Sequence, residues 1–253
     1  MSDYTAFRTR REAALLAPFG PAALVATQWV SEIAEPLEQV SGTWCAVNGT
    51  VVAQGIDPAE ITSIDDGVLW RDSDLVFAPD TAVIWRAKQL LAIERYGTYG
   101  LRIFDPEAPG RKSLRGVDVY PYDPKWVVEA EFALVEATAV EIDLVNGMRV
   151  PGNVTATCTF QLDAQTVTMQ LDSPPGEPTV VSFLDKAASE AGAPLRFLPI
   201  RWPEGNVGKT TLDFNYVTLP PCSFSPHFMC PLPLAANRLP FAVTAGERSL
   251  LRM

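Results

Sequence analysis

The chain has 253 residues, of which 47% are hydrophobic and 20% are charged, a composition typical of a folded globular protein and not of a disordered one. Its formal net charge of −10 argues against nucleic acid and anionic membranes as partners, because both repel an acidic surface. The single histidine, His227, excludes every site that needs two or three imidazoles, such as a three-histidine zinc site.

The sequence also predicts a compartment. No stretch reaches the roughly eighteen consecutive apolar residues of a membrane helix, and charges interrupt the N-terminal segment where a signal peptide would be apolar. Four cysteines are spread along the chain, too widely for the disulfide framework of a small secreted protein; they are Cys45, Cys158, Cys222 and Cys230. We therefore expect a cytoplasmic protein with free thiols.

The N-terminal segment predicts a helix over residues 3–17, which Ser2 or Asp3 can cap and which Pro18 and Gly20 end. A second, shorter helical stretch is expected over residues 31–39, interrupted at Pro36.

Beyond this point the patterns are typical of strands. Two apolar runs on either side of Asn48-Gly49 predict a hairpin with a type I′ turn, because both central residues of that turn need a positive φ. Further apolar runs follow at intervals of about ten residues, a spacing that predicts a meander of short strands. These runs are GVLWR, LVFA, AVIWR, QLLAIE and GLRIF.

The clearest alternation lies between Val154 and Leu171, where apolar residues alternate with threonine and glutamine on both sides of a turn at residues 163–165. It predicts a half-buried antiparallel hairpin with a threonine-rich polar face. An earlier strand over residues 129–145 turns at Asn146-Gly147.

A short helix is expected from Asp185, its cap, to Ala191, with Gly192 closing it. The chain lacks a regular alternation of strands and helices, which argues against a Rossmann fold or a TIM barrel. We expect a mainly β protein, an antiparallel β-barrel or β-sandwich with an N-terminal helix and few short helices. It is predicted as a single domain over residues 1–253, with a strand-rich body over 44–219 and a proline-rich loop over 220–240.

Gly205-Asn-Val-Gly-Lys-Thr210 resembles a phosphate loop only superficially. Two residues separate its glycines where the motif needs four, and the strand-like run TLDFNYV follows where a helix would bind the phosphate. A hairpin turn is the better interpretation.

Cys222 and Cys230 enclose seven residues that include His227, in a segment stiffened by prolines. Two thiolates and an imidazole can bind zinc or place a nucleophile beside a base. The spacing differs from that of a zinc knuckle, so we favour buried free thiols, with no metal and no cofactor. A redox-sensitive pair is the remaining alternative.

Carboxylates are the only plentiful acid–base groups, and three of them lie at predicted strand ends beside apolar residues: Asp105, Asp123 and Asp213. In an apolar cavity the pKa of a carboxyl rises, and the group can act as a general acid or base near neutral pH. Each can equally be a turn cap or an arginine partner. Arg102, just before Asp105, is either that partner or an anchor for an anionic substrate.

Six tryptophans fall singly in predicted strands or at their ends, as core and rim residues do in β proteins. If several converge, they would line a pocket for a hydrophobic ligand. They are Trp29, Trp44, Trp70, Trp85, Trp126 and Trp202.

The C-terminal third carries a series of short motifs: Asp213-Phe-Asn215, Pro221-Cys222, Cys230-Pro-Leu-Pro233, Asn237-Arg-Leu-Pro240 and Ala245-Gly-Glu247. In these the chain resembles a large, uncharacterised bacterial family, domain-of-unknown-function family 1684. Upstream segments resemble it too: Phe7-Arg8 with Arg11-Glu12, Gly100-Leu-Arg102 with Asp105-Pro106, and Gly116 with Tyr120 to Pro124. The resemblance implies a fold and a list of positions but no activity.

The chain departs from the family in one loop. Where members usually have a threonine- and glycine-rich loop, this chain has residues 185–196, in which Asp185 and Arg196 match the family. Residues 22–54 are atypical as well. If the usual loop holds a polar ligand, this protein has lost part of that site or changed its ligand.

We expect a small-molecule-pocket protein. The first hypothesis is a metal-independent acid–base enzyme, a hydrolase, isomerase or cyclase acting on a hydrophobic, secondary-metabolite type of substrate. Its catalytic candidates are Asp213, Asp105 and Arg102, and its binding candidates are Asn215, Tyr120, Asp123, Arg196, Arg238 and Trp85.

Two alternatives differ in class. One is a non-catalytic binding protein for a hydrophobic small molecule, and the other is a partner-binding module in which residues 222–238 form a rigid surface loop. The oligomeric state is left open, with a homodimer as one option.

Overall fold

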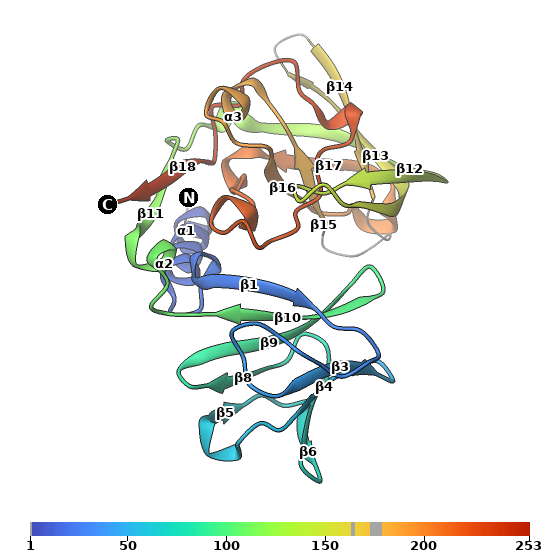
Figure 1. The fold of residues 1–253 in the computed structure, drawn as a ribbon. Coiled ribbons are helices and arrows are strands. Elements are labelled where there is room, and N and C mark those ends of the chain that lie inside the picture. Colours follow the sequence, from blue (N-terminus) through green and yellow to red (C-terminus); the bar gives the residue numbers. More distant parts are fainter. Residues whose placement is uncertain (1, 163–164, 173–178) are drawn as a thin grey trace. The chain divides into compact units, whose positions relative to one another are not determined.

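The computed structural model describes residues 2–162, 165–172 and 179–253 (Figure 1). Contacts within the chain group it into two compact units. Unit 1 consists of Met1–Arg8 and Arg115–Arg252, and unit 2 of Thr9–Leu114 and Met253. The single domain expected over residues 1–253 stays a prediction, because a grouping of contacts does not test which parts fold alone.

Unit 2 contains two five-stranded antiparallel sheets. The first has the order β1 (Leu24–Trp29), β10 (Thr98–Phe104), β9 (Lys88–Arg95), β8 (Ala82–Trp85) and β5 (Ile61–Ile64). The second has the order β2 (Glu35–Pro36), β3 (Thr43–Val47), β4 (Thr50–Gln54), β7 (Asp74–Phe77) and β6 (Val68–Arg71).

Both sheets of unit 2 face one apolar core. Leu101 and Ile103, two residues apart on β10, belong to the same buried cluster as Leu75 and Phe77 of β7. This spacing puts alternate side chains of a strand on one face of its sheet. Trp44 adds its ring from β3, with its centroid 5.8 Å from that of Phe77. The two sheets therefore form a sandwich, and no sheet made by the described residues closes into a barrel.

Unit 1 is built on a four-stranded antiparallel sheet of order β14 (Gln165–Leu171), β13 (Arg149–Leu162), β12 (Val127–Asp143) and β17 (Gly208–Asp213). Two smaller pairs accompany it, β15 (Thr179–Phe183) with β16 (Arg196–Ile200), and β11 (Leu114–Val119) with β18 (Glu247–Arg252).

Phe214 lies at the centre of the core of unit 1. The centroids of three aromatic rings, those of Trp126, Phe160 and Phe183, lie 5.7 to 6.1 Å from the centroid of its ring. Such spacings are typical of edge-to-face and tilted aromatic packing. The residues that follow β17 in the chain therefore start inside the core, and this fixes where the site described below begins.

The helices are few. They are α1 (Ser2–Leu16), α2 (Pro109–Ser113) and α3 (Lys186–Glu190), with single 3-10 turns η1 (Pro21–Ala23), η2 (Pro58–Glu60), η3 (Pro124–Trp126), η4 (Glu204–Asn206), η5 (Phe214–Tyr216), η6 (Pro221–Ser223) and η7 (Ala235–Asn237). No helix in the described ranges combines the length and the hydropathy needed to cross a bilayer. The N-terminal helix and the mainly β fold expected from the sequence are confirmed.

Several local predictions are also confirmed. Asn48 and Gly49 both have positive φ between β3 and β4, as a type I′ turn requires. The alternating segment forms the pair β13 and β14, although the turn expected at 163–165 lies in part outside the described residues. Asp185 caps α3 by accepting a hydrogen bond from the backbone N–H of Ala187.

The helix expected over residues 31–39 is wrong. That segment is mostly irregular and contributes only the two residues of β2, the edge strand of its sheet. The side chain of Gln28 explains the difference, because it accepts a hydrogen bond from the N–H of Glu38 at 2.7 Å and donates one to the Glu38 carbonyl. A side chain that satisfies the backbone in this way replaces the bonds that a helix would make.

Two predictions near β17 need correction. The strand expected over TLDFNYV stops at Asp213, because the Asp213 side chain caps the turn η5 instead of continuing the ladder. The segment Gly205–Thr210 leads into a strand, which agrees with rejecting a phosphate loop. It is not a hairpin turn, however, since β17 pairs with β12 and not with the preceding strand, β16.

Asn237, in the proline-rich segment, is 2% exposed and attaches that segment to the edge strand β14. Its Oδ1 accepts from the N–H of Gln170 at 2.8 Å, and its Nδ2 donates to the carbonyls of Gln170 at 2.9 Å and Ser182 at 3.3 Å. One buried amide therefore joins β14, β15 and η7.

We expect Asn237→Ala to lower the free energy of unfolding of unit 1 by about 1–3 kcal/mol, because it leaves buried peptide groups of Gln170 without partners. Hydrogen exchange of the β13 and β14 amides, read by mass spectrometry, measures this loss for unit 1 alone. Asn153→Ala is the matched control: Asn153 is exposed on β13, and its loss should cost less than about 0.5 kcal/mol. Equal effects of the two variants would contradict this account.

Candidate functional site

Three of the residues predicted from the sequence meet at the end of β17. Oδ1 of Asp213 accepts hydrogen bonds from the backbone N–H of Asn215 at 2.9 Å and from its Nδ2 at 2.8 Å. Asn215 also clasps the backbone of Asp123, accepting from its N–H at 3.0 Å and donating to its carbonyl at 3.1 Å. Segments 92 residues apart in the chain are thereby joined. Asn215 is buried and fully occupied by these bonds, so it positions Asp213 and is not itself available to a ligand.

The second carboxylate oxygen of Asp213 is left open. Asp213 is half-buried, and in the described part of the chain no hydrogen bond reaches its Oδ2. A carboxylate fixed through one oxygen keeps its orientation, while the other oxygen can accept a proton or a hydrogen bond. Asp213 is therefore the best-prepared acid–base group among the residues predicted from the sequence.

Four aromatic side chains, Tyr4, Phe7, Tyr122 and Tyr216, pack together, and we call them the tyrosine cluster. Two of them, Tyr4 and Tyr216, lie within electrostatic reach of Asp213. The centroid of the Tyr4 ring lies 5.0 Å from that of Tyr122 and 5.4 Å from that of Tyr216. The Phe7 centroid lies 4.7 Å from that of Tyr216. Within the described residues, none of the three phenol hydroxyls makes a hydrogen bond to another group. The cluster thus presents apolar ring faces together with hydroxyl groups that a ligand can use.

Burial and the nearby carboxylates keep the phenols of Tyr4 and Tyr216 neutral. Burial raises the pKa of Tyr4 most, Arg8 lowers it, and Asp213 and Glu247 raise it, so that the net pKa lies above its usual range. Burial also raises the pKa of Tyr216, with help from Asp3 and Asp213. Both hydroxyls therefore stay protonated near neutral pH and act as hydrogen-bond donors beside an acceptor carboxylate.

Arg8 holds the first turns of α1 at this cluster. Its Nη1 lies 2.8 Å from Oε1 of Glu247, whose side chain is completely buried. Oε2 of the same carboxylate accepts from the N–H of Leu219 at 2.8 Å. Both oxygens of Glu247 are thus used, and the ion pair fixes the part of α1 that supplies Tyr4 and Phe7.

Arg196, predicted as a binding residue, lies in the core of unit 1 and is 1% exposed. Its Nε and Nη2 bind Oδ1 of Asp185 at 3.1 and 2.8 Å. The remaining N–H groups donate to three carbonyls, those of Val243, Ala245 and Glu247, at 2.8, 2.8 and 3.3 Å. Every donor of the guanidinium has a protein partner, so the geometry gives Arg196 a structural role.

Tyr120 and Arg238 lie elsewhere in unit 1. Tyr120 donates its N–H to the carbonyl of Gly246 at 3.0 Å, and the guanidinium carbon of Arg248 lies 5.5 Å from the centre of its ring. Arg238 is exposed at the rim of a cleft of about 240 Å³ that Glu141 and Asp143 also line. Neither residue belongs to the cluster around Asp213.

The other three candidates belong to unit 2. Asp105 forms an ion pair with Lys88 at 3.0 Å and accepts the N–H of Glu107. Burial raises the pKa of Asp105, but these partners together lower it by more than burial raises it, so the net pKa lies below the usual range. Arg102 is half-buried on β10. Because the structure does not bring Asp105 or Arg102 together with Asp213 inside either unit, the expected catalytic trio remains a prediction.

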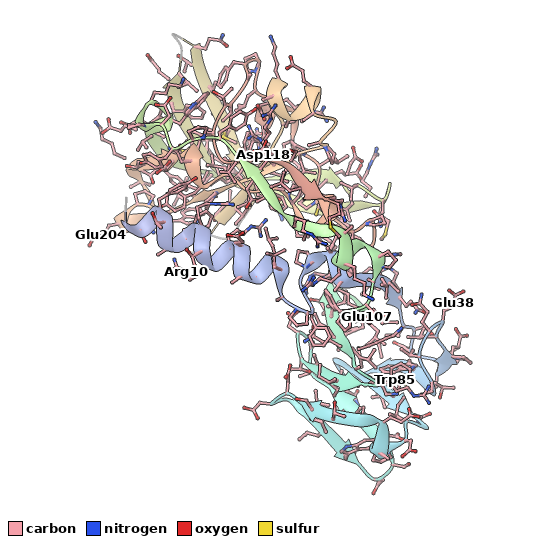
Figure 2. The ribbon with its side chains drawn as sticks, turned by 90° about the vertical axis from the view of Figure 1, so that its left-hand side faces the viewer. Arg10, Glu38, Trp85, Glu107, Asp118 and Glu204 are labelled. Carbon is pink, nitrogen blue, oxygen red and sulfur yellow. The ribbon has the colours of Figure 1, made fainter. Side chains whose placement is uncertain are left out.

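Trp85, labelled in Figure 2, is 4% exposed at the end of β8. Its Nε1 donates to Oε2 of Glu60 at 2.7 Å, and Arg86 covers its ring, with the guanidinium carbon 4.8 Å from the centre. These contacts are those of a core residue with a satisfied N–H group. They leave no open ring face for a ligand.

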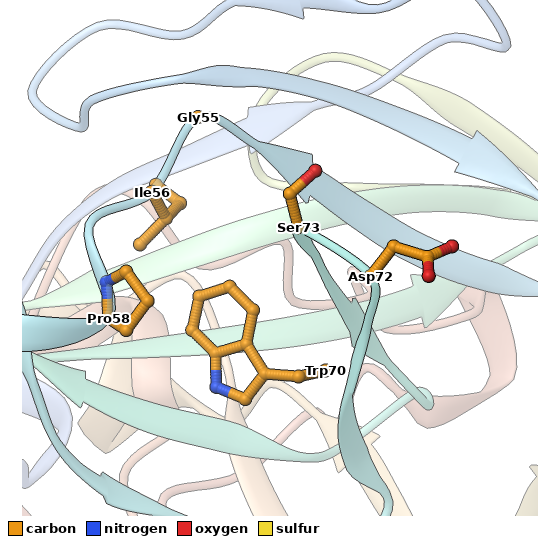
Figure 3. Close-up of a pocket in the computed structure, with 6 residues that line it drawn as sticks. All are labelled: Gly55, Ile56, Pro58, Trp70, Asp72 and Ser73. Atoms are coloured by element: carbon orange, nitrogen blue, oxygen red, sulfur yellow. The ribbon is translucent and has the colours of Figure 1, made fainter.

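Unit 2 has an open cavity of about 400 Å³ that the sequence did not single out (Figure 3). The half-buried indole of Trp70 forms its floor, with Ile56 and Pro58 on one side and Asp72 and Ser73 on the other. Its volume falls in the range of small-molecule sites. The only available signal was Trp70 itself, close to the turn between β6 and β7, and nothing in its pattern separated it from the other tryptophans.

Metal-binding side chains do not converge in the described ranges of the chain. No three of its histidine, cysteine, aspartate or glutamate side chains form a group that could hold an ion. His227 is exposed, and its backbone N–H donates to the hydroxyl of Ser225 at 3.2 Å.

A family model described as "Protein of unknown function (DUF1684)" matches residues 112–248, just over half of the chain. The chain belongs to this family. The matched range of the DUF1684 family contains Asp123, Arg196, Asp213, Asn215 and Glu247. Of the upstream segments that resemble the family, those over residues 7–12 and 100–106 lie outside the match, and the one over residues 116–124 lies inside it.

Among solved structures, the chain is similar to the solution NMR structure of an uncharacterised protein from Haloarcula marismortui, with 31% sequence identity. The match covers 53% of this chain and 76% of that chain, with a TM-score of 0.44. No curated protein matches the sequence.

The buried family residue Arg196 allows a direct test of its structural role. We expect Arg196→Met to destabilise unit 1 by about 3–5 kcal/mol, because it leaves the buried carboxylate of Asp185 without its charged partner. The double variant Arg196→Met, Asp185→Leu should recover part of that loss, as measured by urea unfolding.

Arg248→Met serves as the control, since Arg248 pairs with Asp118 on the surface at 3.4 Å and should contribute less than about 1 kcal/mol. If Arg196→Met were as stable as this control, the buried ion pair would not hold unit 1 together.

Proposed function

We propose that unit 1 is a small-molecule site in which the tyrosine cluster holds a hydrophobic ligand and Asp213 acts on it as a general base. The observation that carries the proposal is the carboxylate of Asp213, fixed through Oδ1 by Asn215 and open at Oδ2 beside aromatic rings. The activity would be that of a metal-independent acid–base enzyme, a hydrolase, isomerase or cyclase, of the kind found in secondary-metabolite biosynthesis.

The chemistry of the cluster supports a ligand with two kinds of surface. Ring faces favour an apolar or aromatic body, and protonated phenols favour oxygen acceptors such as carbonyls and ethers. A developing negative charge on such an oxygen would be stabilised by phenol donors, while Oδ2 takes a proton from the neighbouring carbon or hydroxyl. Arg8 is engaged with Glu247, so it does not neutralise Asp213.

A non-catalytic binding protein for a hydrophobic small molecule is the second candidate. It is favoured by Asp105, whose pKa burial raises but whose hydrogen bond from Glu107 and ion pair with Lys88 bring that pKa below the usual range, so that this carboxyl does not supply the neutral acid of an acid–base pair. A single carboxylate can anchor a ligand without transforming it.

The binding part of the proposal is tested by native mass spectrometry after incubation with an extract of hydrophobic metabolites. We expect a small-molecule adduct on the wild-type chain that weakens at least about tenfold in Tyr4→Ala and in Tyr216→Ala, because each removes a ring from the cluster. Tyr96→Ala changes an exposed tyrosine of unit 2 and should keep the adduct. An adduct that survives both cluster variants would contradict the proposed site.

The catalytic part is tested on the same extract by following which compounds disappear. We expect Asp213→Asn to slow the consumption of those compounds by about 100-fold or more, since an amide cannot take the proton. Asp118→Asn, on the surface strand β11, should turn over at the wild-type rate. A bound compound that the wild-type chain leaves unchanged would favour the binding protein over the enzyme.

A further inference from the structure

Cys222 and Cys230 lie against each other in the proline-rich segment of unit 1. The backbone N–H of Cys222 donates to Sγ of Cys230 at 3.4 Å, and the Cys222 thiol is itself hydrogen-bonded to Cys230. All four cysteines of the chain are free thiols in the structure. Two of them are thus held in contact without a bond between them.

The backbone on both sides holds these two sulfurs in place. Cys222 lies in the turn η6, where the carbonyl of Pro221 accepts the N–H of Phe224 at 2.9 Å. At the other end, the carbonyl of Cys230 accepts the N–H of Val145 at 3.0 Å. Because backbone hydrogen bonds hold the chain at both cysteines, the two sulfurs are kept close together by the fold.

The two thiols differ in access. Cys222 is half-buried, whereas Cys230 is 4% exposed. The other two cysteines are buried among apolar residues, with Cys158 opposite Met169 on β14 and Cys45 opposite Val52 on β4. Cys222 is therefore the more exposed cysteine of the pair, and we expect a small reagent to react there first.

We propose that Cys222 and Cys230 are a dithiol–disulfide site that is oxidised by low-molecular-weight disulfides. The thiolate of Cys222 attacks such a disulfide, RSSR, forming a Cys222–S–S–R bond and releasing RS⁻, which takes up the Cys222 proton. Sγ of Cys230, as its thiolate, then attacks Sγ of Cys222, and the second RS⁻ leaves and takes up the proton of Cys230. In total RSSR gains two electrons and becomes two RSH, and the protein dithiol becomes one disulfide.

The greater exposure of Cys222 sets this order of steps, and the contacts between the two sulfurs set their rates. The hydrogen bond with Cys230 and burial raise the pKa of Cys222, so its thiol form predominates near neutral pH and the first exchange is slow. The N–H of Cys222 points at the Cys230 sulfur and stabilises negative charge on it, which suits a resolving thiolate. The pair therefore stays reduced until a disulfide reagent is abundant.

Digestion with trypsin separates the cysteines conveniently. Cleavage after Lys209 and Arg238 leaves Cys222 and Cys230 together in peptide 210–238, while Cys45 and Cys158 fall in peptides 12–71 and 150–186. The full chain is incubated with excess oxidised glutathione, its remaining thiols are alkylated after unfolding, and the peptides are analysed by mass spectrometry. We expect peptide 210–238 to lose two hydrogens and take up no alkylating reagent, while Cys45 and Cys158 are alkylated.

Two variants distinguish the order of attack. Cys230→Ser should stop at the first step and accumulate the glutathione adduct on Cys222, and Cys222→Ser should give no adduct on the buried Cys230. A wild-type peptide 210–238 that stays fully alkylated, or that carries glutathione without closing the disulfide, would overturn the proposal. This readout needs no ligand, so it is independent of the proposed function.

Closing the disulfide also has a measurable physical effect. The bond reduces the conformational entropy of the unfolded chain between residues 222 and 230. The oxidised protein should therefore melt roughly 5 to 10 °C higher than the reduced one. The shift should vanish on addition of dithiothreitol and be absent in Cys222→Ser. If the oxidised and reduced wild-type chains melt at the same temperature, the expected stabilisation by a Cys222–Cys230 disulfide is contradicted.

Discussion

The buried guanidinium of Arg196 is the contact on which the architecture of unit 1 depends. It satisfies Asp185 at the start of α3 and three carbonyls of the C-terminal segment at once. A buried guanidinium is tolerated only when all its N–H groups have acceptors. The C-terminal segment must therefore pass where its carbonyls accept from Arg196. Glu247, on that path, then reaches Arg8 and fixes the first turns of α1. The position of the tyrosine cluster therefore depends, through Glu247 and Arg8, on the buried ion pair of Arg196 and Asp185.

The same logic accounts for much of the family signature. Asn215, Asn237, Gly246 and Glu247 are buried and hold backbone together. Gly246 has a φ of +70°, and a Cβ there would lie 2.5 Å from the carbonyl oxygen of Val217. A proline-rich segment with few strands needs such side-chain clamps, because it cannot use ladder hydrogen bonds. The motifs that identify the family thus describe mainly how its C-terminal segment is fastened.

Local patterns predicted what is determined locally. The turn at Asn48-Gly49, the β13–β14 hairpin and the cap of α3 depend on residues close in sequence, and each is confirmed. The pattern of residues 31–39 does not predict their non-helical path, because that path depends on Gln28, whose side chain is recognisable as a partner only in three dimensions. For the site, the sequence singled out Asp213, Asn215 and Asp123. It could not find Tyr4 or Tyr216, because their meeting depends on the buried pair of Arg8 and Glu247.

Asn237 has a consequence for how the main sheet of unit 1 ends. Its amide offers one acceptor and one donor to Gln170, the same pair of groups that a peptide unit of a neighbouring strand would offer. The side chain thus imitates a fifth strand at a single point and occupies the place where another β-segment would begin to pair. An edge occupied in this way resists pairing with a foreign chain, so one asparagine protects the β14 edge of the sheet, the edge opposite β17, at the point where a further strand would begin to pair.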